Sequence, residues 1–263
     1  MPALRFFSFL LAAALAYAVL AYGEAGSPAS PITVIESPAA PPAMVIGFVG
    51  GFVKHDAAAH STVQVVEHLR NEYPAGVYVQ AFENRRQGKA YKEILRQLDL
   101  NNDGALSNDE KRKARIIIFG HSWGASETVT LARKLERDGI PVLLTIQVDS
   151  VSKIGQNDRV IPTNVGQAVN FYQPDGIVHG QSAIRAADPA KTEIMGNFRF
   201  DYKANPIRCE GYPWFDRVLV KAHTEIECDP KVWNQVEALI YSKLAPEKRD
   251  TAARNPALKP QLF

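Results

Sequence analysis

Residues 115–149 constrain the fold of this chain more than any other stretch. They begin with RIIIFG, an apolar and β-branched run that predicts a buried strand, and continue with ASETVTLARKLERDG, whose apolar positions follow a helical period. Gly139 suits the C-cap of that helix, and Pro141 starts a second buried strand, PVLLTIQVD. Two such strands joined through one helix predict a parallel strand pair with a crossover connection.

The same alternation precedes this unit. AMVIGFVGGF and GVYVQAF have the composition of buried strands, while STVQVVEHLRNEY and GKAYKEILRQL are amphipathic. The chain is therefore predicted to be an α/β protein with a mostly parallel sheet flanked by helices on both faces. Beyond residue 149 the pattern weakens. NVGQAVNFYQ is expected to be a short helix running into a strand, GNFRFDYK and FDRVLVKAH two further strands, and DPKVWNQVEALIYSKLA a closing helix.

The 263 residues, 46% of them hydrophobic, suit one α/β domain, which we place at residues 44–245. Residues 1–26 have an early Arg5 and a long apolar run, the layout of a signal peptide or an uncleaved N-terminal anchor. A linker rich in Pro, Ala and Ser is expected over 27–43, and a flexible tail over 246–263. The protein is thus expected to be secreted or periplasmic, or tethered to the outer face of the inner membrane.

The charge balance bears on which partners the protein can bind, and the cysteine content bears on its redox compartment. Lys and Arg total 30 against 28 Asp and Glu, so no electrostatic attraction to nucleic acid is expected. The two cysteines, Cys209 and Cys228, are an even number in a chain predicted to be exported, which favours a disulfide over free thiols.

Ser122 lies at the centre of GHSWG, between the predicted strand and the predicted helix. A catalytic serine needs a sharp strand-to-helix turn that exposes its hydroxyl and leaves the next amide free to donate. Gly120 and Gly124 relieve crowding at such a turn, and the helix N-terminus favours negative charge beside the serine. The alternative is a turn serine that only caps the helix.

With this turn, the chain resembles the α/β-hydrolase superfamily, in particular its lipase, esterase and thioesterase branches. The resemblance spans the element order from 45 to 244, and GHSWG is its specific motif. It implies a catalytic triad in the chain order Ser, acid, His. Asp149 ends a strand downstream of Ser122 and is the expected acid; Asp158 is its rival. Asp149 has a structural interpretation too, as a cap of the next turn together with Ser150.

The family order places the histidine last, on a loop after a late strand. Only His179 and His223 follow the GHSWG motif. His223 comes after the strand-like RVLVKA and before the closing helix, and is therefore the expected catalytic base, whereas His179 is expected to be a loop histidine.

The same resemblance implies an oxyanion hole made of two backbone amides. Trp123, the residue after the serine, should supply one, and Gly51 or Phe52 in the loop after the first strand the other. Many relatives carry a His-Gly pair in that loop, where this chain has Val49-Gly50-Gly51.

A second motif, DLNNDGALSNDE, occupies residues 99–110 and matches D-x-[DN]-x-[DN]-G-x5-E at every specified position. It resembles an EF-hand calcium loop. The oxygen ligands that this implies are Asp99, Asn101, Asp103, the carbonyl of Ala105, Ser107 and Glu110. Only about one helical turn follows before the next strand, so we expect a single structural Ca²⁺ site. The alternative is an Asn/Asp/Gly surface turn without metal.

Together these features predict an exported serine hydrolase that cleaves a carboxylic ester or thioester, with a small-molecule or lipid ester as substrate and Ca²⁺ as a stabilising ion. Aromatic residues late in the chain favour lipid esters slightly; they are Phe171, Tyr172, Tyr212, Trp214 and Phe215. The alternative is a calcium-binding, membrane-tethered interaction protein that keeps the hydrolase fold without turnover.

Overall fold

The computed structural model describes residues 41–244. The predicted signal peptide or anchor (1–26), most of the linker (27–43) and the tail (246–263) lie outside these residues. The elements, in chain order, are β1 (Ala43–Val49), α1 (Ser61–Glu72), β2 (Val77–Glu83), the 3-10 turn η1 (Asn84–Arg86), α2 (Gln87–Leu98), α3 (Asn108–Arg112), β3 (Ile116–His121), α4 (Trp123–Arg137), β4 (Val142–Val148), β5 (Val160–Ile161), β6 (Val165–Tyr172), β7 (Arg185–Ala186), β8 (Glu193–Arg199), α5 (Trp214–Leu219), α6 (Lys221–Cys228) and α7 (Pro230–Leu244).

The main sheet has six strands in the order β2-β1-β3-β4-β6-β8, and every neighbouring pair is parallel. The predicted α/β class and parallel sheet are confirmed. Because His121 pairs with Val148, and Val148 in turn with Phe171, the strands β3, β4 and β6 end side by side. Loops that follow these strands therefore meet at the carboxyl edge of the sheet, where parallel α/β proteins place their ligands.

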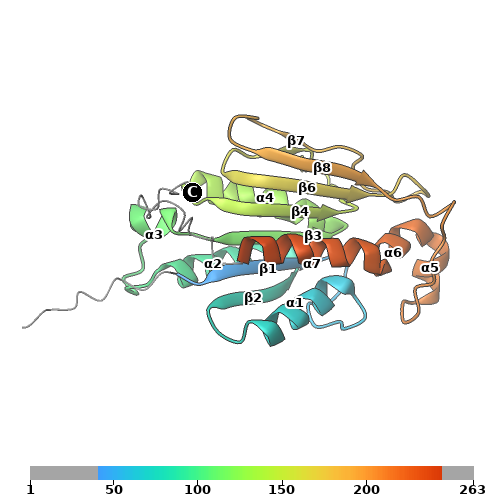
Figure 1. The fold of residues 1–263 in the computed structure, drawn as a ribbon, viewed down its shortest axis with the longest axis horizontal. Coiled ribbons are helices and arrows are strands. Elements are labelled where there is room, and N and C mark those ends of the chain that lie inside the picture. Colours follow the sequence, from blue (N-terminus) through green and yellow to red (C-terminus); the bar gives the residue numbers. More distant parts are fainter. Residues whose placement is uncertain (1–40, 245–263) are drawn as a thin grey trace, which may run out of the picture. The chain divides into compact units, whose positions relative to one another are not determined.

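Helices cover both faces of this sheet (Figure 1). Strand β3 shows why its sequence is apolar without interruption: Ile117 and Phe119 pack in the core beneath α1, α6 and α7, while Ile116 and Ile118 pack in the core beneath α2 and α4. A strand buried on both faces needs apolar residues at successive positions.

None of the helices in residues 41–244 is both long and apolar enough to cross a membrane.

Two expectations for the second half are wrong. Residues 164–173 contain no helix, because β6 is a strand over its whole length, with Val165, Ala168 and Phe171 buried. FDRVLVKAH is not a strand either: it forms most of α5 and the start of α6. The apolar residues of α5 stay exposed, so they never form the buried face that a strand assignment assumes.

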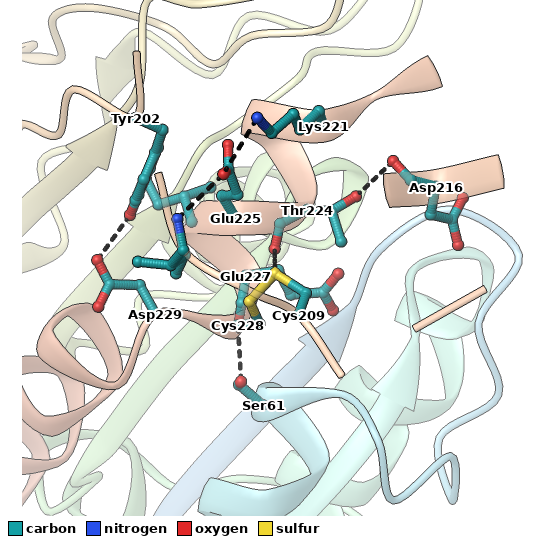
Figure 2. The surroundings of a disulfide bond; sticks show 12 residues. Ser61, Tyr202, Cys209, Asp216, Lys221, Thr224, Glu225, Glu227, Cys228 and Asp229 are labelled. Atoms are coloured by element: carbon teal, nitrogen blue, oxygen red, sulfur yellow. Dashed lines mark hydrogen bonds and ion pairs between the residues drawn. A yellow bond between two sulfur atoms is a disulfide. The ribbon is translucent and has the colours of Figure 1, made fainter. Parts of the chain in front are cut away.

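The predicted disulfide is present between Cys209 and Cys228, with the two Cα atoms 5.7 Å apart (Figure 2). It ties the segment before α5 to the end of α6. Closing a loop with a sequence separation of 19 contributes about 3 kcal/mol in the chain-entropy model. The bond therefore anchors the C-terminal end of the short α6, the helix that carries His223, to the segment that precedes α5.

Candidate active site

Ser122 occupies the turn between β3 and α4, with backbone angles φ 57° and ψ −124°. Two glycines allow β3, β1 and α4 to approach this closely. A Cβ atom on Gly124 would lie 2.2 Å from the carbonyl oxygen of Phe48, and one on Gly120 would lie 2.7 Å from the backbone of Gly124. The Ser122 side chain makes no capping hydrogen bond to α4. The serine is thus held in a sparsely populated conformation that only close packing maintains.

The structure brings Ser122, His223 and Asp149 together. The Oγ atom of Ser122 lies 2.8 Å from Nε2 of His223, and Nδ1 of the same ring lies 2.6 Å from Oδ2 of Asp149. Asp149 follows β4, as predicted. His223 lies inside helix α6 and not on a loop after a strand, which corrects the expected setting of this residue. The order and spacing are those of a nucleophile, a base and an orienting acid.

The carboxylate of Asp149 is fully buried and accepts several further hydrogen bonds. Its Oδ1 accepts from the backbone amide of Gly180 at 2.7 Å and from that of Gln173 at 3.2 Å, and its Oδ2 accepts from Nε2 of Gln173 at 2.9 Å. A Cβ atom on Gly180 would lie 2.5 Å from the backbone of Asp149. Gly180 and Gln173 belong to no recognisable motif, so their contacts with Asp149 could not be predicted from the sequence.

The two rival residues lie elsewhere. Asp158 is buried, and its Oδ2 lies 2.5 Å from the hydroxyl of Ser150. Burial raises the pKa of the Asp158 carboxyl. His179 points its Nδ1 toward the carbonyl of the following Gly180, at 3.5 Å. The structure therefore pairs Asp149, and not Asp158, with His223.

The loop after β1 packs directly on the serine. A Cβ atom on Gly50 would lie 3.0 Å from Cβ of Ser122. Asn84 fixes this loop by donating from Nδ2 to the carbonyls of Val49 and Gly51. The ring of Phe52, 81% exposed, meets that of Trp123 edge-on, with centroids 5.6 Å apart. Trp123 is the first residue of α4, and the first amides of a helix have no hydrogen-bond partner within that helix.

The EF-hand-like stretch forms a loop between α2 and the short α3. Its carboxylates accept hydrogen bonds from the loop itself: Asp99 from the amides of Asp103 and Gly104, and Glu110 from that of Leu100. Ser107 caps α3 in a capping box with Glu110. Across residues 41–244, no three His, Cys, Asp or Glu side chains gather as metal ligands would.

No protein-family model matches the chain, and no curated protein does. Similar solved structures include an acetyl xylan esterase (12% identity, TM-score 0.38, 78% of this chain and 100% of that one). A second is the RedJ thioesterase of the prodiginine biosynthetic pathway in Streptomyces coelicolor, with 13% identity and a TM-score of 0.33 over 72% of this chain and 92% of that one. A third is an uncharacterized protein from Pseudomonas aeruginosa, with 10% identity and a TM-score of 0.36 over 76% of this chain and 50% of that one. Similarity this distant assigns no activity to the chain.

Proposed function

We propose that the protein is an exported serine hydrolase that cleaves a carboxylic ester or thioester. The observation that carries the proposal is the continuous chain of two hydrogen bonds from Asp149 through His223 to Ser122, with the serine on a strained strand-to-helix turn. A serine that served only as a turn residue would require neither the strain nor the buried imidazole–carboxylate pair.

The reaction would run in two halves. Nε2 of His223 removes the hydroxyl proton as Oγ of Ser122 attacks the substrate carbonyl carbon, and Asp149 stabilises the resulting imidazolium. The amides of Trp123 and of Gly51 or Phe52 bind the oxyanion. His223 then protonates the leaving alcohol or thiol, which departs and leaves an acyl group on Ser122. Water, deprotonated by the same imidazole, attacks that acyl group; the bond from Oγ to the acyl carbon breaks, the imidazolium returns its proton to Oγ of Ser122, and the carboxylic acid is released.

Exposed apolar side chains favour substrates with an apolar acyl or alcohol group. Phe52 lies at the predicted oxyanion loop, and Trp214 and Phe215 on α5 are 69% and 48% exposed. Phe171 and Tyr212, in contrast, are buried and belong to the core. Large exposed aromatics in a globular domain commonly mark a binding surface, so medium-chain and longer p-nitrophenyl esters are the first substrates to compare with the acetate.

A fluorophosphonate probe tests the activated serine directly. Wild-type protein is expected to label, and Ser122→Ala and His223→Ala are expected to lose labelling, because one removes the nucleophile and the other its base. His179→Ala is the matched control and should label like wild type. A folded wild-type protein that does not label would favour the non-catalytic interaction protein. A membrane-impermeant version of the probe, applied to intact cells, tests export.

We further propose that residues 99–110 bind one Ca²⁺ ion with a structural role. Two observations support this proposal. Every position of the EF-hand motif is present in a loop between the helices α2 and α3, and Leu106 of that loop packs against the core beneath α2 and α4. The residues that would hold the ion are Asp99, Asn101, Asp103, the carbonyl of Ala105, Ser107 and Glu110. For this, Glu110 would exchange its hydrogen bonds with the loop for coordination.

Calcium is expected to stabilise the protein measurably. With a dissociation constant of roughly 0.1–1 mM, 10 mM Ca²⁺ would add about 1.4–2.7 kcal/mol to the unfolding free energy. The measurement is Tm with Ca²⁺ against chelator. Glu110→Gln should abolish the Ca²⁺-dependent rise, whereas Asp109→Asn, which removes an exposed carboxylate paired with Lys113 at 2.6 Å, should keep it. No rise in the wild type would leave the loop a metal-free surface turn.

A further inference from the structure

A second buried carboxylate lies behind the catalytic histidine. Glu227 stands on α6, four residues after His223, so both side chains project from the same side of the helix. Its Oε1 lies 2.6 Å from Nδ1 of His60, which precedes α1. The hydroxyl of Ser61 donates to the backbone carbonyl of Glu227 at 2.6 Å (Figure 2). His60 and Ser61, at the start of α1, therefore hold Glu227 by two hydrogen bonds, one to its side chain and one to its backbone.

His121 connects this carboxylate with the proposed triad. Its ring is 3% exposed and lies against that of His223, with centroids 4.6 Å apart and planes inclined by 34°. Its Nδ1 lies 3.5 Å from Oε2 of Glu227. Neither ring nitrogen of His121 has a hydrogen-bond partner in residues 41–244. Because a buried imidazole and not water lies between the carboxylate and the proposed base, the charge of Glu227 is only weakly screened at His223.

We propose that Glu227 is a positioning residue of the active site, which raises the proton affinity of His223 through His121, and that His60 sets its strength by neutralising it. The inference rests on the proposed function. Glu227 and His60 then act on His223 with opposite signs. The carboxylate of Glu227 favours the imidazolium form of His223, and a protonated His60 disfavours it.

The protonation states of the network agree with this assignment. Burial lowers the pKa of His121 to about 4, so this ring is neutral near pH 7. Burial also acts to lower the pKa of His60, but the hydrogen bond and charge of Glu227 outweigh it and raise that pKa. Burial acts to raise the pKa of Glu227, whereas the facing imidazoles of His121 and His60 act to lower it, His60 through its hydrogen bond at 2.6 Å, and the pKa is lowered. Glu227 is therefore the charged member.

Other ionisable groups face the network as well. Asp216 on α5 adds negative charge near His60, with its own pKa raised by burial and by Glu227. Tyr212 packs its ring edge-on against His60, and burial and Glu227 raise its pKa out of the titration range. The charge of Asp149 also acts on His121 and opposes the lowering of its pKa by burial. Among the titratable groups that face Glu227, His60 lies closest to its carboxylate, at 2.6 Å, so its charge opposes that of the carboxylate most directly.

The test is a histidine NMR titration of the full-length protein labelled with ¹⁵N-histidine, with the His223 signal assigned by its loss in His223→Gln. Glu227→Gln is expected to lower the pKa of His223 by about half a unit to one unit, and His60→Gln, which still donates to Glu227, to raise it. Glu237→Gln removes the carboxylate of an exposed pair, His68 with Glu237 at 3.2 Å, and should leave it unchanged.

The acid limb of kcat/KM should shift with the same signs, to lower pH in Glu227→Gln and to higher pH in His60→Gln. An unchanged His223 pKa in Glu227→Gln, or shifts of equal sign in both variants, would overturn the inference. If Glu227→Gln does not fold, His60→Gln alone still tests the inference. A His223 pKa that does not rise in His60→Gln would reject the neutralising role of His60. The titration needs no turnover, so a wild type that fails to label would reject the hydrolase while leaving this result interpretable.

Discussion

Replacing Asp149 with Asn is expected to lower kcat about 10⁴-fold while the protein remains folded. The carboxylate accepts from Nδ1 of His223 at 2.6 Å, which keeps the proton on Nδ1 and leaves Nε2 unprotonated toward Ser122. An Asn amide can donate to Nδ1 and so favours the opposite tautomer, in which Nε2 carries the proton and cannot act as a base. Ester turnover by the purified variant, compared with wild type, is the measurement.

Asp158→Asn is the matched control, because Asp158 is as deeply buried but pairs with the Ser150 hydroxyl. Its kcat is expected to stay within a few-fold of wild type. The labelling rate with the fluorophosphonate should fall with kcat in Asp149→Asn, since both need the same base. If instead Asp158→Asn loses activity and Asp149→Asn retains it, the assignment of the acid is wrong.

The sheet and the serine turn were predictable because their signals are local. The apolar runs of β1, β3 and β4 each lie within one segment, and a helix or turn separates them along the chain. Once the strands are parallel, the ends of β3 and β4 must lie side by side, which places Ser122 near Asp149 without further information. The disulfide between Cys209 and Cys228 followed from cysteine count alone.

The setting of His223 was not predictable in the same way. RVLVKA has the β-branched content of a strand, but a short apolar run such as Val218-Leu219-Val220 does not distinguish a strand from a helix. In the structure α5 and α6 are short helices, and the apolar side chains of α5 remain exposed. Chain order still singled out His223, which the structure places 2.8 Å from Ser122, because order depends on topology and not on the local element.

The hydrogen-bond partners of Asp149 and Glu227 were not predictable from the sequence for another reason. Gln173 and Gly180 reach Asp149 across 24 and 31 residues, and His60 reaches Glu227 across 167. No spacing rule relates positions so far apart. A buried histidine next to a serine, as in His121, carries no local sign that a glutamate on a distant helix faces it. Only the packed structure reveals these pairs.

Gly124→Ala is expected to have the largest effect on stability of any single methyl group added at this site. Its Cβ atom would lie 2.2 Å from the carbonyl oxygen of Phe48, 2.6 Å from the carbonyl carbon and 2.8 Å from the oxygen of Val49. All three are backbone atoms of β1, which is paired with β2 and β3 and cannot rotate aside. Helix α4 must therefore move away from the sheet, at a cost of roughly 3 kcal/mol or more.

This movement would also displace the amide of Trp123 and the hydroxyl of Ser122, because both lie at the first turn of α4. Thermal unfolding should show Tm lower by about 6–12 °C, and fluorophosphonate labelling should be slowed even well below that temperature. Gly88→Ala is the control: a Cβ atom added there, in α2, would meet no atom within 4 Å apart from its chain neighbours and the backbone of its own helix, so Tm should stay or rise. An unchanged Tm in Gly124→Ala would mean that α4 and β1 do not pack as closely as the glycine spacing requires, and the strained serine turn would lose its structural cause.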